Sequence, residues 1–197
     1  MAELAKSPPM TAEEFAAWAD DPSRSERRFI LDAGRPVEMA SPKRAHGFVN
    51  WLLIRVLTKY VDVRGGYLLT HDTGMILSRG PDTILAPDVI LFLTPPAADE
   101  SSRWVYVEAD VPQLVVEVRS PTDRDSRILR RVMQYHRYGV PLVWVIDPED
   151  RVATSYRPDE FPKVLDETDD LTGNGVLPAF ACKVSEFFTL PGPAPTA

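Results

Sequence analysis

Two acidic residues stand where runs of apolar residues would be expected to continue. Asp88 follows Pro87 at the entrance to the apolar run 89–93, and Glu117 lies inside the run 114–118. A charge buried without a partner is costly, so each carboxylate needs an explanation. An acid that follows proline at a strand end is commonly a charge facing water, and this is the alternative for Asp88. Glu117 is central in its run and therefore requires an arginine, a metal ion or a raised pKa.

Two carboxylates on neighbouring strands suit a hard divalent cation such as Mg²⁺, because magnesium takes oxygen ligands and keeps several waters. Such an ion polarises a phosphodiester and lowers the pKa of a bound water, so that hydroxide attacks near neutral pH. A third group, usually a lysine, orients that water or offsets charge on the phosphate oxygens. In the order Glu117–Val118–Arg119, the cation nearest to the second acid is an arginine.

Six arginines lie between positions 119 and 137. Arg124, Arg127 and Arg131 follow i, i+3 and i+7 spacing, so they share one face of the helix expected there, and that spacing suits tracking of a phosphate backbone. The alternative is a solvated face whose arginines pair with the surplus Asp and Glu. Phosphate binding is favoured if the two acids meet at the start of that helix.

His46 lies near the start of a second predicted helix. It is a candidate for binding substrate or orienting water, since only histidine titrates naturally near neutral pH. Alternatively, it is a helix-start residue that bonds to the backbone. Lys43 lies one turn earlier and is a candidate to reach the same site, because no lysine lies in the segment that carries the two acids and the following helix.

The N-terminal third of the chain is expected to hold two helices with a hairpin between them. Thr11 and Glu14 form a capping-box pattern that starts a short helix. Short extended runs around Ala33–Gly34 predict a β-hairpin, and Pro36 makes its second strand an edge strand. Apolar residues recur near helical spacing from 42 to 61 and predict a core helix.

Beyond this helix, the pattern changes to short β-rich runs that are expected to form a sheet. A charged amphipathic helix is expected from Asp123 to Tyr138, between the strand that carries Glu117 and an apolar strand at 142–146. That order is a crossover unit, and strand 142–146 is expected to pair back with 152–156. The prediction is an α/β fold in which a mixed β-sheet is flanked by helices. The strands expected before the crossover are 67–70, 75–77, 89–93 and 114–118.

Length and composition favour one domain in a reducing compartment. The 197 residues, 44% of them hydrophobic, predict a single domain at 10–190 between loose tails at 1–9 and 191–197. A formal charge of -7 argues against coating of nucleic acid through bulk positive charge. The single cysteine, Cys182, and the absence of an apolar leader or a membrane-length run predict a cytoplasmic protein with no membrane partner. Cys182 itself is expected to be a small buried hydrophobe.

Several motifs along the chain are specific in combination, although no single one is. They are Met10-Thr-Ala-Glu-Glu-Phe15, Val37-Glu-Met-Ala-Ser-Pro42 with His46-Gly47, Pro87-Asp88-Val89, Leu114-Val-Val-Glu-Val-Arg-Ser-Pro-Thr122, Gln134-Tyr135 before Gly139-Val140-Pro141, Val143-Trp-Val-Ile-Asp-Pro148 and Val184-Ser-Glu-Phe-Phe188.

This combination resembles the Uma-type putative restriction endonuclease family, which belongs to the PD-(D/E)XK nuclease superfamily. The resemblance implies a restriction-endonuclease-like core, with Asp88 and Glu117 as ligands of Mg²⁺ or Mn²⁺ and Arg119 in the slot of the basic residue. In many relatives a lysine on the next helix takes over that role, and Arg131 stands at its position. The glutamate that family members commonly carry in the early hairpin aligns with Ile30.

The leading hypothesis is an Mg²⁺-dependent DNA endonuclease in which Asp88 and Glu117 hold the metal. Arg119 and Arg131 would stabilise the transition-state phosphate, and His46 would assist. A homodimer is expected because one active site cuts one strand. One alternative keeps the fold as a module that binds nucleic acid or a partner without cleaving, because arginine cannot handle protons as lysine does. Another is a hydrolase of a different phosphoester. The expected substrate-binding residues are Lys43, Arg124 and Arg127.

Overall fold

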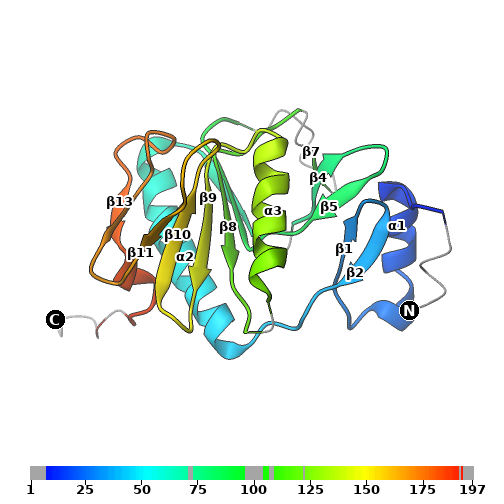
Figure 1. Cartoon of the computed structure of the whole chain (residues 1–197), viewed down its shortest axis with the longest axis horizontal. Helices are drawn as coiled ribbons and strands as arrows, with labels where there is room; N and C mark the ends of the chain where they lie inside the picture. The colour runs from blue at the N-terminus through cyan, green and yellow to red at the C-terminus, as the bar shows by residue number, and fades with distance from the viewer. Residues whose placement is uncertain are drawn as a thin grey trace.

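The computed structural model describes residues 8–70, 73–95, 104–106, 109–121, 123–190 and 192. The predicted tails, 1–9 and 191–197, lie almost entirely outside this part of the chain. The molecule is elongated, with the first helix and hairpin at one end and the C-terminal strands at the other (Figure 1).

The N-terminal helix α1 (Ala12–Ala19) confirms the capping-box prediction. Thr11 Oγ1 accepts a hydrogen bond from the Glu14 N–H at 3.2 Å, and Glu14 Oε2 accepts one from the Thr11 N–H at 2.8 Å. These two bonds satisfy donors that a helix start leaves open. A short 3-10 turn, η1 (Pro22–Arg24), follows α1.

The smaller of the two main sheets contains the predicted hairpin, β1 (Phe29–Asp32) and β2 (Arg35–Glu38). Its strand order is β2-β1-β5-β4-β7, so β2 is an edge strand, as Pro36 predicts. Its other strands are β4 (Met75–Ser78), β5 (Thr83–Leu85) and β7 (Val105–Tyr106).

The larger sheet is mixed, as predicted, with order β11-β10-β9-β8-β6-β3. The pairing of β8 with β9 is parallel, and the other pairings are antiparallel. The expectation that strand 75–77 joins this sheet is wrong, because β4 pairs with β5 and β7 in the smaller sheet. The strands of the larger sheet are β3 (Tyr67–Thr70), β6 (Val89–Phe92), β8 (Leu114–Val118), β9 (Val143–Asp147), β10 (Val152–Tyr156) and β11 (Lys163–Leu165).

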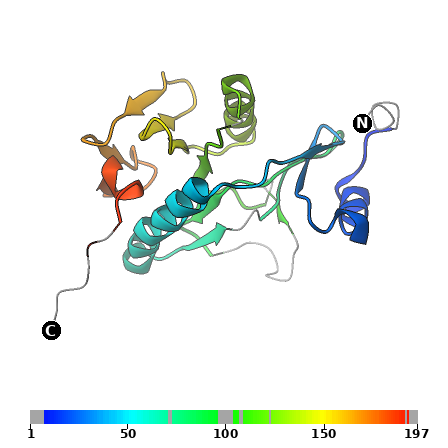
Figure 2. The ribbon, with the colours of Figure 1, turned by 90° about the horizontal axis from the view of Figure 1, so that it is seen from below.

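Helix α2 (Arg44–Arg64) confirms the predicted core helix and packs on one face of this sheet. Helix α3 (Asp125–Arg137) packs on the other through Ile128 and Val132, and Figure 2 shows the two helices on opposite sides. Not every apolar residue of the predicted core helix is buried, since Trp51 is 44% exposed.

The C-terminal part completes the packing on the α2 face. Strands β12 (Asp170–Thr172) and β13 (Ala181–Lys183) pair with each other and lead into the 3-10 turn η2 (Val184–Phe187). Cys182 is buried there, as expected. No helix among the described residues is long and apolar enough to cross a membrane.

The crossover β8-α3-β9 is also as predicted, and it fixes the position of the acids. Residues alternate between sheet faces, and Val115, two positions before Glu117, faces α3. On β6, Ile90 and Phe92 face α3, so Asp88 belongs to the same face. Since Val89 pairs with Val116, continuing this antiparallel register by one residue places Asp88 opposite Glu117.

Candidate active site

A cavity of about 440 Å³ lies between α3 and the β1–β2 hairpin. Asp88 and Glu117 line it together with Asp123, His46 and Arg131. The two acids singled out from the sequence therefore meet in one cavity, beside the start of α3.

Glu117 is 3% exposed and both of its carboxylate oxygens accept hydrogen bonds. Arg131 Nη1 donates to Oε2 at 2.8 Å, and the Tyr135 hydroxyl donates to Oε1 at 2.6 Å. Burial raises the pKa of Glu117 to about 7, because the positive charge of Arg131 only partly opposes it and the negative charge of Asp88 adds to it. Of the three explanations that the sequence leaves open for this acid, an arginine partner and a raised pKa both hold.

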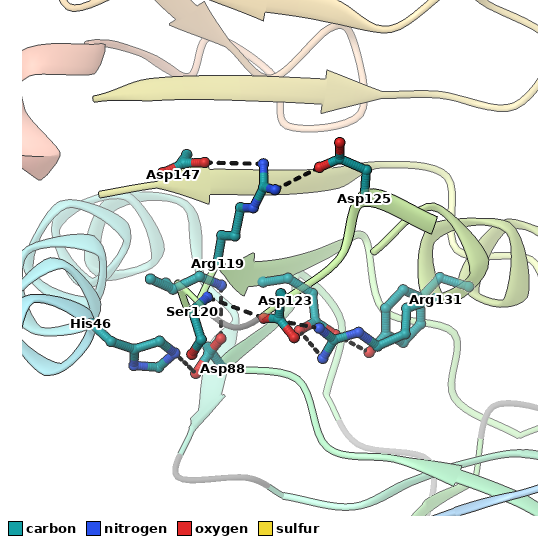
Figure 3. Close-up of polar contacts among 11 residues, drawn as sticks. His46, Asp88, Arg119, Ser120, Asp123, Asp125, Arg131 and Asp147 are labelled. Carbon is teal, nitrogen blue, oxygen red and sulfur yellow. Dashed lines mark hydrogen bonds and ion pairs between the residues drawn. The ribbon is translucent and has the colours of Figure 1, made fainter. Parts of the chain in front are cut away.

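Asp88 is 8% exposed, so it is not a strand-end charge facing water. Its Oδ2 accepts the Val118 N–H at 2.7 Å, which fixes the carboxylate beside the strand that carries Glu117. Its Oδ1 lies 3.1 Å from His46 Nε2. The N-terminal turn of α2 thus brings His46 into the site, as Figure 3 shows.

The guanidinium of Arg131 lies between two acids. Its Nη2 is 3.6 Å from Asp123 Oδ2, and that oxygen also accepts the Ser120 N–H at 3.1 Å. The Nε–H of Arg131 is buried and has no hydrogen-bond acceptor among the described residues. The negative charge of Glu117 raises the pKa of Arg131, so the group stays charged.

Arg119, expected in the slot of the basic residue, does not line this cavity. Its guanidinium lies 3.2 Å from Asp147 and 2.6 Å from Asp125, apart from the group around Asp88 (Figure 3). The Arg119 N–H donates to the Ile146 oxygen of β9, and the side chain reaches toward Asp147 of β9 and Asp125 of α3 rather than toward Asp88.

The expected substrate-binding residues are divided between two hollows. Arg124 and Arg127 line the cavity, and neither forms an ion pair within the described chain. Lys43 lines a neighbouring hollow of about 520 Å³, which shares His46 and Ser120 with the first. Two arginines are therefore free to meet an anion at the acidic site.

Asp123 and Tyr135 are site residues that the sequence reasoning did not assign. Tyr135 is four residues after Arg131, so both side chains lie on one helix face, and this spacing is the signal that could have found it. Asp123 precedes α3 in a loop, where an acid is ordinary turn chemistry, and no spacing in the sequence distinguishes it.

Asp88 and Glu117 fit a magnesium site that takes part of its shell from outside the protein. Each carboxylate oxygen has two lone pairs and accepts one hydrogen bond here, so acceptor positions remain. No group of three or more His, Cys, Asp or Glu side chains arranged for a metal occurs in the described ranges. The remaining ligands would be waters and phosphate oxygens, which Mg²⁺ commonly keeps. Ile30, which the resemblance aligns with a glutamate, also lines the cavity.

The chain is similar to known proteins in sequence and in fold. The model of the Uma2 family, described as putative restriction endonuclease, matches residues 12–185. A crystal structure of a putative nuclease belonging to DUF820, from Anabaena variabilis, is similar with a TM-score of 0.76 and 17% identity. The similarity covers 91% of this chain and 98% of that one, which shows a shared fold. Among curated proteins, no sequence matches the chain.

Proposed function

We propose, on the premise that the chain belongs to the Uma2 family of putative restriction endonucleases, that it is a metal-dependent endonuclease that cleaves DNA phosphodiester bonds. The observation that carries the proposal is the meeting of Asp88 and Glu117 in one cavity beside the guanidinium of Arg131. A cytoplasmic location, expected from the single cysteine, is compatible with a DNA substrate.

Asp88 and Glu117 are the residues that would hold Mg²⁺ or Mn²⁺. When bound, the cation supplies Lewis acidity that polarises the phosphodiester and makes a water nucleophilic near neutral pH. Asp88 is already oriented for this role by the Val118 N–H, and Glu117 by the Tyr135 hydroxyl. Fixed carboxylates need little reorganisation when substrate arrives.

Arg131 acts on the phosphate of the substrate, and His46 acts on the attacking water. The guanidinium of Arg131 is held by Glu117 and Asp123, and its positive charge offsets negative charge on the phosphate oxygens. His46 Nε2 lies 3.1 Å from Asp88 Oδ1, so the imidazole is positioned to hold that carboxylate and to orient a water beside it.

Arg124 and Arg127 bind phosphates that flank the cleaved bond, because both line the cavity without an acidic partner in the described chain. Lys43 extends this contact into the neighbouring hollow. Arg119 is a positioning residue, since it joins Asp147 at the end of β9 to Asp125 at the start of α3. Because each site cuts one strand, cleavage of both strands calls for a homodimer.

A second candidate, a module that binds nucleic acid without cleaving it, is favoured by one observation. The fixed positive charge of Arg131 lies 2.8 Å from Glu117, where it already compensates the buried carboxylate. Arginine stays protonated, so it cannot pass a proton as lysine does. A site compensated in this way would bind phosphate firmly and turn over slowly.

Cleavage of supercoiled plasmid DNA tests the proposal. We expect nicking that depends on added Mg²⁺ or Mn²⁺ and falls by at least about 100-fold in Asp88→Asn and in Glu117→Gln. Glu160→Gln is the matched control, because Glu160 is an acid on the exposed β10–β11 connection. The control should cleave as the wild type does.

Three other outcomes would overturn the endonuclease proposal. Cleavage that persists in both acid variants would place the chemistry elsewhere. DNA binding without cleavage under either metal would identify the module. A protein that neither binds nor cleaves DNA but hydrolyses a small phosphoester model compound would identify a different phosphohydrolase.

A further inference from the structure

One stripe of α3 is exposed and points away from the catalytic cavity. It consists of Asp125, Leu129, Met133 and Arg137, spaced four residues apart on one side of the helix, and we call it the α3 stripe. Leu129 is 45% exposed and Met133 is 70% exposed. None of the four residues lines the cavity that holds the acids. Two exposed apolar side chains therefore lie between an acidic and a basic end.

The α3 stripe of one copy is complementary to the α3 stripe of a second copy that runs in the opposite direction. If two copies of α3 pack antiparallel about a two-fold axis, Asp125 stands opposite Arg137 of the second copy, and Leu129 stands opposite Met133. Side chains four residues apart form the ridges that commonly interdigitate when helices pack. We propose that the chain forms a homodimer in which the α3 stripes of two copies pack antiparallel.

A groove beside the stripe offers space for the apolar side chains of the second copy. It has a volume of about 330 Å³, and α3 contributes Asp125, Ile128 and Leu129 to its wall. The rest of its wall comes from Arg119, from β9 and β10, which lie to the side of α3 (Figure 1), and from Asp150 in the turn between them. Met133 of the second copy would stand next to Leu129, and its flexible, unbranched side chain suits an irregular groove.

Charge at the two ends favours a second copy over another partner. The side chain of Asp125 is 78% exposed, so it has room for another cation beside Arg119. Arg137 stacks on Tyr138 and forms no ion pair in the part of the chain that the structure describes. A copy of the same stripe supplies an acid for Arg137 and a second cation for Asp125, in the required order.

This arrangement leaves both cavities open. Arg124 and Arg127 belong to the cavity side of α3, whereas the stripe lies outside the cavity lining. A dimer of this kind would carry two accessible sites, one for each strand of a duplex. The association itself does not depend on cleavage, so its failure and the failure of the endonuclease proposal are separate results.

Sedimentation equilibrium of the full chain without DNA or metal tests the proposal. We expect a dimer whose dissociation constant rises at least about tenfold in Met133→Glu, because a charge would be buried in the apolar centre. Val63→Glu is the matched control, since Val63 is 83% exposed on α2, outside the stripe, and it should leave the dimer unchanged. A monomer at every concentration, or a dimer unaffected by Met133→Glu, would overturn the proposal.

A charge exchange tests the antiparallel order. Arg137→Glu alone and Asp125→Lys alone should each weaken the dimer, because each sets like charges opposite one another. The double variant should recover the wild-type dissociation constant to within about threefold, since the charges are again opposite in sign. If the double variant is as weak as the weaker single variant, the two ends do not meet and the antiparallel order is wrong.

Discussion

The carboxyl group of Glu117 is subject to opposing influences. Burial and the nearby charge of Asp88 favour its protonated form, whereas the guanidinium of Arg131 favours the charged form. Burial is the largest of these, so the pKa is raised from an ordinary 4.5 to about 7. The same low exposure raises the pKa of the Tyr135 hydroxyl well above 10, which keeps that group a hydrogen-bond donor to Glu117.

The raised pKa of Glu117 predicts a pH-dependent stability in metal-free protein. The folded state binds the Glu117 proton more tightly than the unfolded state does, so this contribution is complete below about pH 4.5 and is lost as the pH rises through about 7. Glu117→Gln cannot titrate and lacks the contribution. We therefore expect the melting temperature of the wild type, relative to that of Glu117→Gln, to fall between pH 4.5 and pH 7.5 in EDTA.

Thermal melts of the two proteins across that interval check the sign. Glu160→Gln, which changes an acid of the exposed β10–β11 connection, serves as the control for the general effect of losing one carboxylate. A difference between the wild type and Glu117→Gln that stays constant from pH 4.5 to pH 7.5 would contradict the assignment of a raised pKa to this carboxyl group.

Replacement of Arg131 by lysine tests whether the arginine lowers the rate of DNA cleavage. Lysine keeps the positive charge next to Glu117, and its ammonium can give up a proton when it is partly buried, whereas the guanidinium cannot. We expect Arg131→Lys to cleave plasmid DNA at least about tenfold faster than the wild type in single-turnover assays at saturating Mg²⁺. Arg55→Lys makes the same exchange on α2, away from the cavity, as a control. An unchanged or slower rate for Arg131→Lys would show that arginine is not the limiting feature.

At the scale of elements, α3 and the β1–β2 hairpin form the two sides of the cavity and are tied together by one acid. Asp32 of β1 accepts from Arg130 Nη2 at 2.9 Å and from Gln134 Nε2 at 3.2 Å. Arg130 and Asp32 are 63% and 22% exposed, so this pair adds about 1 kcal/mol or less to stability. Its effect is therefore on the position of the hairpin rather than on folding.

Asp32→Ala should loosen the hairpin without unfolding the protein. We expect faster hydrogen–deuterium exchange of the β1 and β2 amides and a change in unfolding free energy of no more than about 1 kcal/mol. Arg27→Ala is the control, because Arg27 bonds to Glu38 at the base of the hairpin and does not cross the cavity. If exchange in Asp32→Ala equals that of the wild type, the contact across the cavity does not restrain the hairpin.

Elements that depend on the local spacing of residues could be predicted from the sequence. The pairing of strands that are distant in the sequence could not. The cap at Thr11 and the crossover that carries Glu117 follow from spacing and were confirmed. The assignment of β4 was wrong because its partner β5 has three residues and no distinctive alternation. Sequence spacing also suggested that Arg119 accompanies Glu117, whereas its side chain pairs with Asp147 and Asp125 outside the cavity.

At the scale of the whole molecule, a formal charge of -7 must be reconciled with a polyanionic substrate. Two arginines of the cavity wall already pair with acids, Arg131 with Glu117 and Arg130 with Asp32. Arg124 and Arg127 remain as unpaired cations on the cavity wall within the described chain. A DNA substrate would therefore make few phosphate contacts, all of them local to the cavity.

Few contacts predict a shallow salt dependence of DNA binding. In the Asp88→Asn background, which prevents cleavage, the plot of log K against log salt should have a slope between about -2 and -4. Removal of both arginines in Arg124→Ala/Arg127→Ala should reduce the slope by about 2, because two phosphate contacts are lost. Fluorescence anisotropy from 50 to about 300 mM salt measures both slopes. An unchanged slope in the double variant would place the phosphate contacts on another surface.

Location of the metal tests the central claim most directly. In crystals grown with Mn²⁺, the anomalous difference map should show one strong peak in the cavity, with an oxygen of Asp88 and an oxygen of Glu117 each about 2 Å from it. The same crystals of Glu117→Gln should lose that peak. A peak bound by neither carboxylate, or an empty cavity in which Arg131 alone compensates Glu117, would contradict the claim that these two acids hold the cation.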